Sequence, residues 1–427
     1  MSHEELLARH RAVMPSWLAL YYDEPIALSH GQGRRVWDAE GKAYLDFFGG
    51  ILTTMTAHAL PEVVEAIREQ SGRMLHTSTL YMIEPAVELA EQIAELAPIP
   101  EAKVFFTTSG TEANEAALLL ACTARRSQQV LAMRNSYHGR SFAAMGITGN
   151  RGWSASSLSP VDVSYVQGGY RYRSPFADLD DAAYIQTYVD DLQEVIATTT
   201  AGDVACLIAE PIQGVGGFAM PPDGFFAPVK EVCDQHGIVF ITDEVQTGWG
   251  RTGEHFWGID AHGVTPDILT FAKGLGNGVS LAGVVARADL MDALPGNSIS
   301  TFGGNPLSCA AGVANLRYLR ENDLQQNAHI VGEHLTGRVR SALEHHEAVG
   351  DIRGKGLMLG VELVRPGGTT PAPEAASHVL ERCRAGGLLI GKGGLYGNVL
   401  RIAPPMTLTM AEADEGAEII IDAITSL

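Results

Sequence analysis

The middle of the chain alternates short, almost continuously apolar runs with helical stretches, and no other feature constrains the fold as strongly. The apolar runs cover residues 104–108, 129–133, 205–210, 237–244 and 267–272. Strands that are apolar on both faces are typical of a parallel sheet that helices cover on both sides. The sequence therefore predicts an α/β fold whose ligand site lies beyond the carboxyl ends of these strands.

The flanking segments predict a second, smaller domain. Residues 34–48 alternate around a Glu-Gly pair, which predicts a hairpin, whereas 61–73 and 85–96 have helical spacing. A long helical stretch runs from about 312 through 343. It is followed by short strands in 354–363, 387–394 and 398–405, with a helix near 373–385. Strands and helices mixed in this way favour an α+β arrangement for the C-terminal part.

A length of 427 residues fits two or three domains. We predict an N-terminal segment (1–55) that contributes to the small domain and a large domain (56–315) with a mostly parallel central sheet. The remaining residues (316–427) are predicted to complete the small α+β domain. The Gly- and Arg-rich segment 168–180 is predicted to be a surface excursion.

Charge and cysteine content narrow the class of protein. The formal net charge of −20 would repel nucleic acid and anionic membranes, so we expect neither as a partner. No apolar run approaches the roughly 20 residues that span a bilayer, and residues 1–11 resemble neither a signal nor a transit peptide. The odd number of scattered cysteines favours reduced thiols over disulfides or a zinc site, and predicts a cytoplasmic protein without a metal. These cysteines are Cys122, Cys206, Cys233, Cys309 and Cys383.

Polar residues follow the first three of the predicted strands. Ser109, Gly110 and Thr111 open a helix, where free backbone N–H groups and hydroxyls can bind a phosphate; a simple N-cap is the alternative. Tyr137 lies beside a glycine and could stack on a flat ligand, unless it belongs to a packed turn. Glu210 ends the third strand, where a carboxylate is often only solvated or capping.

The last two strands end on residues of opposite charge. Side chains alternate along a strand, so Asp243 and Val245 point to one side and Glu244 to the other. An acid at the end of an apolar strand requires a cationic partner. Of the six lysines, only Lys273 terminates a central strand, and burial there would make its neutral, nucleophilic amine accessible. The alternative is an ordinary ion pair with an acid at a strand end.

These residues together match what pyridoxal 5′-phosphate requires. The aldehyde of this cofactor needs an amine (Lys273), and its pyridine nitrogen needs an acid (Asp243) to stay protonated. Its phosphate needs a helix N-terminus, which Gly110 and Thr111 offer. Its ring needs groups above and below, for which Tyr137 and Val245 are the candidates. The sequence therefore predicts a pyridoxal phosphate enzyme with the cofactor held as a Schiff base on Lys273.

The chain resembles the class III (ω-amino acid) aminotransferases, which are fold type I pyridoxal phosphate enzymes. Nine segments match in the order of the family and cover nearly the whole chain. They include TTSGTEANEAALLLA (107–121), SYHGR (136–140), AEPIQG (209–214), TDEVQTGWGRTG (242–253), PDILTFAKGLGNG (266–278), STFGGNPLSCAA (300–311), IRGKGLMLGVEL (352–363) and LRIAPP (400–405). The resemblance implies a ping-pong aminotransferase with Lys273 and Asp243 as catalytic residues. Its substrates would be an ω- or β-amino donor, or a related amine, and a 2-oxo acid acceptor.

The resemblance also implies further binding residues. Gln246 would lie near the ring oxygen of the cofactor, and Thr301 would reach the phosphate of a neighbouring subunit, because family members are dimers with shared sites. Arg401 would bind an α-carboxylate, with Glu210 neutralising it otherwise. Arg140 and Ile51 match positions that face the distal end of the substrate in 4-aminobutyrate aminotransferases.

Departures from the family pattern leave the substrate open. Ala57-His58 and Leu60-Pro61 replace the usual Gly-His and His-Pro. TFGGNP resembles the alanine–glyoxylate/β-amino acid branch, whereas Arg140 resembles the 4-aminobutyrate and ornithine branch. The motifs also allow a decarboxylating transaminase, an aminomutase, a racemase or a phospho-lyase. A third interpretation is a protein that binds the cofactor but catalyses no reaction. The sequence does not choose between a dimer and a tetramer.

Overall fold

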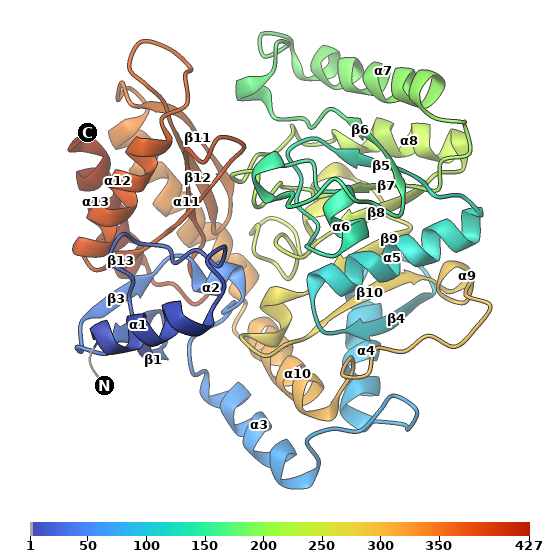
Figure 1. Ribbon diagram of the computed structural model, residues 1–427, viewed down its shortest axis with the longest axis horizontal. Coiled ribbons are helices and arrows are strands. Elements are labelled where there is room, and N and C mark those ends of the chain that lie inside the picture. The colour runs from blue at the N-terminus through green and yellow to red at the C-terminus, as the bar shows by residue number, and fades with distance from the viewer. Residues whose placement is uncertain (1–2) are drawn as a thin grey trace.

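The computed structural model describes residues 3–427 as a large lobe built on a central sheet and a small lobe formed by the two ends of the chain (Figure 1). The central sheet has seven strands in the order β4-β10-β9-β8-β7-β5-β6. Its strands are β4 (Ala102–Thr107), β5 (Gln129–Met133), β6 (Asp162–Val166), β7 (Cys206–Ala209), β8 (Val239–Asp243), β9 (Ile268–Phe271) and β10 (Ala282–Arg287). Only β10 runs against the others, so the predicted α/β fold with a mostly parallel sheet is confirmed.

Alternating side chains of these strands fill two apolar layers. Leu131, Leu207 and Phe240 pack with one layer, which includes residues of α7 (Asp181–Thr199) and α8 (Phe226–His236). Val130 and Ile241 point the other way and pack with α5 (Gly110–Arg125). Burial on both faces explains why these strands are almost continuously apolar in sequence. Two strands of the central sheet were not predicted, β10 and the partly exposed edge strand β6.

The small lobe contains two sheets. One is antiparallel, in the order β11-β12-β15-β14; the other is β1-β2-β3-β13 and joins the N-terminal hairpin to residues far along the chain. β3 (Ala43–Asp46) pairs in parallel with β13 (Leu388–Leu389), so strands from the two ends of the chain share one sheet. The other strands are β1 (Leu28–Gln32), β2 (Arg35–Asp38), β11 (Val349–Lys355), β12 (Met358–Leu363), β14 (Gly391–Gly393) and β15 (Val399–Ile402).

The prediction of one long helix through residue 343 is wrong. The structure has two helices, α10 (Pro306–Glu321) and α11 (Leu324–Leu343), because Asp323 lies at a φ of 49°, where a right-handed helix cannot continue. The break lets α10 pack against α3 (Pro61–Arg73) and α4 (Glu84–Leu96), whereas α11 packs against α13 (Met410–Thr425).

Segment 168–180 is more than the predicted surface excursion, because it joins the two lobes. The Tyr170 hydroxyl lies in hydrogen-bonding contact with the Glu362 carboxylate of β12. Arg353 of β11 reaches back and donates to the Gly217 carbonyl oxygen from Nε at 3.0 Å and from Nη2 at 2.7 Å. Buried polar contacts of this kind fix how the lobes sit against each other.

The remaining elements are short or peripheral. They are α1 (His3–Val13), α2 (Gly49–Leu52), α6 (Phe142–Gly146), α9 (Ala288–Met291), α12 (Pro373–Ala385) and the 3₁₀ turns Arg151–Trp153, Arg171–Arg173, Gly258–His262 and Lys273–Gly276. Of the helices within residues 3–427, none is long and apolar enough to cross a membrane.

Candidate active site

Most of the predicted site residues line one cavity at the carboxyl ends of five strands of the central sheet. β4, β5, β7, β8 and β9 all end at this edge of the sheet, as the alternating pattern predicts. Eight predicted residues line the cavity: Gly110, Thr111, Tyr137, Glu210, Asp243, Val245, Gln246 and Lys273. Asn114, His138 and Gly139 complete the lining.

Lys273 lies in a constrained loop directly after β9. Its φ of 42° is unusual for a residue with a side chain, and the following turn is tied down by Asn315 of α10, which donates to the carbonyl oxygens of Gly274 and Leu275 at 3.0 and 2.9 Å. Within residues 3–427 the amine makes no hydrogen bond or ion pair. Burial lowers the pKa of Lys273 from 10.5 to about 8; Asp243 opposes this decrease and Arg401 adds to it. A neutral, nucleophilic amine is therefore available near physiological pH.

Asp243 is held by two residues to which sequence reasoning gave no role. Its Oδ2 atom lies 2.8 Å from Asn114 Nδ2 and 2.8 Å from His138 Nδ1, and all three side chains are buried. Asn114 in turn accepts a 2.7 Å hydrogen bond from Thr270 Oγ1 of β9. Asn114 follows Gly110 by one helical turn, and that spacing is the signal that could have placed it on the cavity side of α5.

The N-terminus of α5 serves both as a helix cap and as a cradle for an anion. Ser109 caps the helix by accepting a hydrogen bond from Glu112 N at 3.2 Å, which leaves the amide groups of Gly110 and Thr111 at the cavity. A Cβ on Gly110 would lie 3.2 Å from Val245 Cγ1, and a Cβ on Gly139 would lie 2.5 Å from Thr111 Oγ1. Backbone without side chains lets a phosphate approach closely, so these residues fit the phosphate group of the cofactor.

Glu210 and Arg401 do not form the direct pair that the family resemblance implies. Glu210 accepts hydrogen bonds from the backbone N–H groups of Tyr137 and Gly214, both at 2.8 Å. Arg401 donates from Nη2 to Gln246 Oε1 at 2.8 Å. Burial raises the pKa of Glu210 to about 7, with Asp243 adding to this and His138 opposing it. In this structure the guanidinium of Arg401 is therefore bound by Gln246 and not by Glu210.

Arg401 lies between two aromatic rings. Its guanidinium carbon is 5.3 Å from the centre of the Phe48 ring and 4.9 Å from that of Phe218. Burial lowers its pKa to about 10, and its Nε atom has no hydrogen-bond partner within residues 3–427. A buried cation with an unused donor is suited to bind a carboxylate that brings its own charge.

Five predicted residues lie outside the lining of this cavity. Ser109 and Arg401 are described above, and the other three are exposed. Arg140 is exposed; its backbone N–H donates to Thr111 Oγ1 at 3.3 Å and its guanidinium lies 5.5 Å from the Trp17 ring. Ile51 is exposed at a φ of 67° in the loop after Phe48. Thr301 is exposed beside Ser300. Burial alone would raise the pKa of Glu112, but hydrogen bonds from Ser300 and Thr108 lower it, which places the 300 loop near the start of α5.

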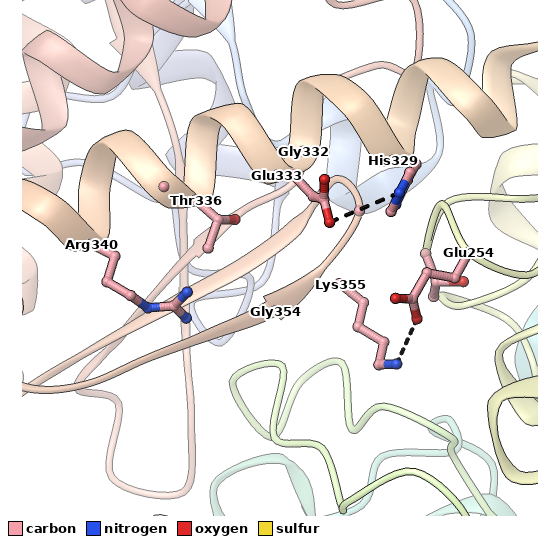
Figure 2. Close-up of a pocket in the computed structure, with 11 residues that line it drawn as sticks. Glu254, His329, Gly332, Glu333, Thr336, Arg340, Gly354 and Lys355 are labelled. Carbon is pink, nitrogen blue, oxygen red and sulfur yellow. Dashed lines mark hydrogen bonds and ion pairs between the residues drawn. The ribbon is translucent and has the colours of Figure 1, made fainter.

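A second cavity lies away from this site, between α11 and the β11–β12 hairpin, and is shown in Figure 2. Its charged groups already have partners: Lys355 Nζ lies 2.8 Å from Glu254 Oε2, and His329 Nε2 lies 3.8 Å from Glu333 Oε1. None of the predicted site residues lines it. We therefore assign the chemistry to the cavity at the strand ends.

Comparison with known proteins identifies the family to which the chain belongs. The sequence profile of the class III aminotransferases matches residues 20–424. An alanine–glyoxylate aminotransferase 2 homologue from Arabidopsis thaliana is 39% identical over 97% of this chain and 86% of its own length. A 5-aminovalerate aminotransferase from Pseudomonas aeruginosa is 36% identical over 100% of this chain and 99% of its own.

The fold of the chain is also similar to that of solved transaminases. The crystal structure of an (S)-enantioselective ω-transaminase from Thermomicrobium roseum superposes with a TM-score of 0.92 at 33% identity, covering 100% of this chain and 99% of that one. The comparisons favour transamination over the other reactions that the motifs allow. With a profile match along almost its whole length and this site at the strand ends, the chain belongs to the class III aminotransferases, which are fold type I enzymes that depend on pyridoxal 5′-phosphate.

Proposed function

We propose that this enzyme transfers the amino group of an ω- or β-amino acid, or of a related amine, to a 2-oxo acid in a ping-pong reaction, with Lys273 as the residue that holds the cofactor. One observation carries the proposal: the Lys273 amine lies at the cavity without a hydrogen-bond partner in residues 3–427, with a pKa lowered to about 8. When bound, pyridoxal phosphate supplies a reactive aldehyde and a ring that withdraws electrons from the carbon next to the nitrogen.

The residues of this chain would divide the work as follows. Asp243, oriented by Asn114 and His138, would hold the proton on the pyridine nitrogen. Gly110 and Thr111 would bind the phosphate through the start of α5, and Tyr137 and Val245 would hold the ring. Lys273 moves the proton to and from the substrate carbon that bears the amino group.

The two arginines suit the two kinds of substrate. We propose that Arg401 binds the α-carboxylate of the 2-oxo acid, which would displace the Gln246 amide from its guanidinium. Arg140, beyond the lining of the cavity, is proposed to bind a distal carboxylate, with Ile51 beside the same end of the substrate. Arginine suits both tasks because its planar fork matches a carboxylate. Since the net charge of −20 repels carboxylates at long range, recognition depends on such short contacts.

Two experiments test the proposal. Borohydride reduction of the yellow enzyme should fix the cofactor to the peptide that contains Lys273; label on Lys355 or Lys392 would contradict the assignment. A panel of amines incubated with pyruvate, 2-oxoglutarate or glyoxylate should give stoichiometric amino acid product. Interconversion of amino acid enantiomers without any added 2-oxo acid would indicate a racemase instead.

We propose that the active enzyme is a homodimer that shares its sites, and the chain could also form a tetramer. Thr301 is exposed, as are the apolar side chains of Leu80, Met82, Ile299 and Phe302, and such a cluster suits an interface. Mixing Lys273→Ala with Thr301→Glu subunits should create one intact site per heterodimer and restore activity. Activity no higher than that of either parent, despite proven subunit exchange, would contradict sharing.

The cell compartment and the domain boundaries are also proposals. All five cysteines are free thiols, which supports a cytoplasmic location. We retain the division into 1–55, 56–315 and 316–427, although residue 315 lies inside α10. Limited proteolysis tests this boundary, because a cut between α10 and α11 would move it to about residue 323.

A further inference from the structure

The segment between α1 and β1 has no regular secondary structure, yet it contacts the surroundings of both proposed carboxylate-binding arginines. Trp17 and Tyr21 belong to this segment, and both are exposed to solvent. Their aromatic rings nevertheless have defined partners from distant parts of the chain. Tyr21 stacks on Phe48, which directly precedes α2 (Gly49–Leu52), the short element that contains Ile51. Figure 1 shows the N-terminal segment passing close to α2.

Tyr21 forms the outer layer of a stack that ends on Arg401. The centre of its ring lies 5.8 Å from that of the Phe48 ring, and the two ring planes differ by 14°. The Phe48 ring lies against the Arg401 guanidinium, which also contacts the Phe218 ring. The Tyr21 hydroxyl is held by the backbone of Lys392, to whose carbonyl it donates at 3.1 Å.

Phe48 has little freedom to move away from this stack. A Cβ on Gly391 would come within 2.1 Å of its ring, so the neighbouring strand β14 confines it from another side. Removing the Tyr21 ring would therefore free the outer side of Phe48 alone. Through Phe48, the N-terminal segment limits how the Arg401 guanidinium can lie.

Trp17 contacts the other arginine, Arg140, directly. Its ring lies 5.5 Å from the Arg140 guanidinium, a cation–π distance. Trp17 is 71% exposed, so packing in the core does not explain its position. Arg140 in turn influences the Tyr137 hydroxyl electrostatically and its backbone contacts Thr111, so it lies next to the cavity.

We propose that residues 17–21 form a specificity element in which each aromatic ring positions one arginine. Tyr21 acts through Phe48 on Arg401 and therefore on the α-carboxylate. Trp17 acts on Arg140 and therefore on a distal carboxylate. This proposal rests on the roles of the two arginines given above, and it adds two positioning residues that touch neither cofactor nor reacting atoms.

The test measures the two half-reactions separately in the intact holoenzyme. Trp17→Ala should raise the KM for 4-aminobutyrate about two- to fivefold, the equivalent of an exposed cation–π contact, and leave the KM for pyruvate unchanged. Tyr21→Ala should raise the KM for pyruvate about two- to tenfold, as expected for the loss of an aromatic pair, and leave 1,4-diaminobutane unaffected. Trp17→Phe, which keeps a ring, should recover most of the affinity.

The control is Phe176→Ala, which removes another exposed aromatic ring far along the chain and should change neither KM. Equal losses for carboxylate-bearing and carboxylate-free substrates in either variant would overturn the proposal, as would no change in any KM. The parallel variant Arg140→Ala separates the two levels of inference. If it is selective against 4-aminobutyrate while Trp17→Ala is not, the specificity element fails and the proposed role of Arg140 stands; if Arg140→Ala is itself not selective, that role fails.

Discussion

The floor and the rim of the cavity are built in different ways. The floor consists of Asp243 at the end of β8 and Lys273 directly after β9, with their supports Asn114 from α5 and His138 from the loop after β5. Asp243, Asn114 and His138 are buried. The rim consists of Arg140 and the N-terminal segment, whose side chains are exposed and have few contacts. Groups on a hydrogen-bonded sheet keep their geometry, whereas exposed groups can be exchanged at little cost in stability. We therefore expect the floor to fix the chemistry of the enzyme and the rim to be the place where its substrate preference can change.

The largest effect should follow the removal of the central residue of the floor. Lys273→Ala should abolish transamination, a loss of at least about 10⁴-fold, since both the attachment point and the proton carrier disappear. The protein should stay folded, because the substitution removes a poorly solvated amine and leaves the side chains of the apolar core in place. Steady-state rates together with a thermal melt check this. A variant that retains a few per cent of activity would move the assignment to another lysine.

Arg401 belongs to the small lobe but is as buried as the floor, so its loss should resemble a floor mutation. Leaving a bound α-carboxylate unpaired should cost about 2–4 kcal/mol, or about 30- to 1,000-fold in kcat/KM for every 2-oxo acid. Arg401→Lys should recover little, because a point charge cannot replace the fork. Specificity constants for pyruvate and 2-oxoglutarate measure this. An effect confined to one acceptor would contradict a general α-carboxylate role.

Asp243→Asn should separate the two functions of the floor, cofactor binding and turnover. Loss of a charge-assisted hydrogen bond worth about 1.5–3 kcal/mol should lower kcat about 10- to 150-fold. The rate at which wild-type apoenzyme takes up pyridoxal phosphate should rise with pH through about 8, because burial lowers the pKa of Lys273 and the attacking amine must be neutral.

The same pH experiment on Asp243→Asn gives a sign that a general loss of structure would not. The negative charge of Asp243 raises the pKa of Lys273, so its removal should move the midpoint of cofactor uptake below that of the wild type. Free lysine in solution is the control for the ionisation of the cofactor itself. A midpoint that stays at the ordinary lysine value of 10.5 in both proteins would show that Lys273 is not desolvated.

The smallest of these effects should come from the rim. Arg140→Ala should lower kcat/KM for an ω-amino acid about fivefold, at the upper end for an exposed charge pair, and should spare a carboxylate-free diamine. The loss is smaller than for Arg401 because water competes for an exposed guanidinium. Comparing 4-aminobutyrate with 1,4-diaminobutane measures it. Equal losses for the two donors would mean that Arg140 has only a structural role.

The order of residues along the strands was enough to predict the floor. An apolar strand, a polar residue at its end and a parallel neighbour leave few arrangements, and so Asp243, Lys273, Glu210 and the start of α5 were expected at one edge. The alternation of side chains also placed Glu244 away from Asp243. In the structure Glu244 indeed turns from the cavity and accepts hydrogen bonds from Gly258 N and Ile259 N at 2.9 and 2.8 Å.

The supports of the floor were visible in the sequence but carried no signal strong enough to assign them. His138 and Asn114 stand beside predicted residues, yet which of their atoms meets Asp243 depends on the packing of α5 against β8 and β9. The break at Asp323 was missed for a similar reason. Helical periodicity continues through it, and only the different packing partners of α10 and α11 require the chain to turn there.

Local sequence pattern thus predicted the large lobe, the edge at which the cavity lies and several of the residues that line it, because strand periodicity and strand direction act over short distances. Tertiary structure alone decided that Arg401 binds Gln246 and not Glu210, that Trp17 lies against Arg140, and that Tyr21 stacks on Phe48, which lies against Arg401. The contacts of Arg401 with Gln246 and Phe48, and of Trp17 with Arg140, each join residues more than a hundred positions apart. Their geometry depends on how the whole chain packs, which no local pattern encodes.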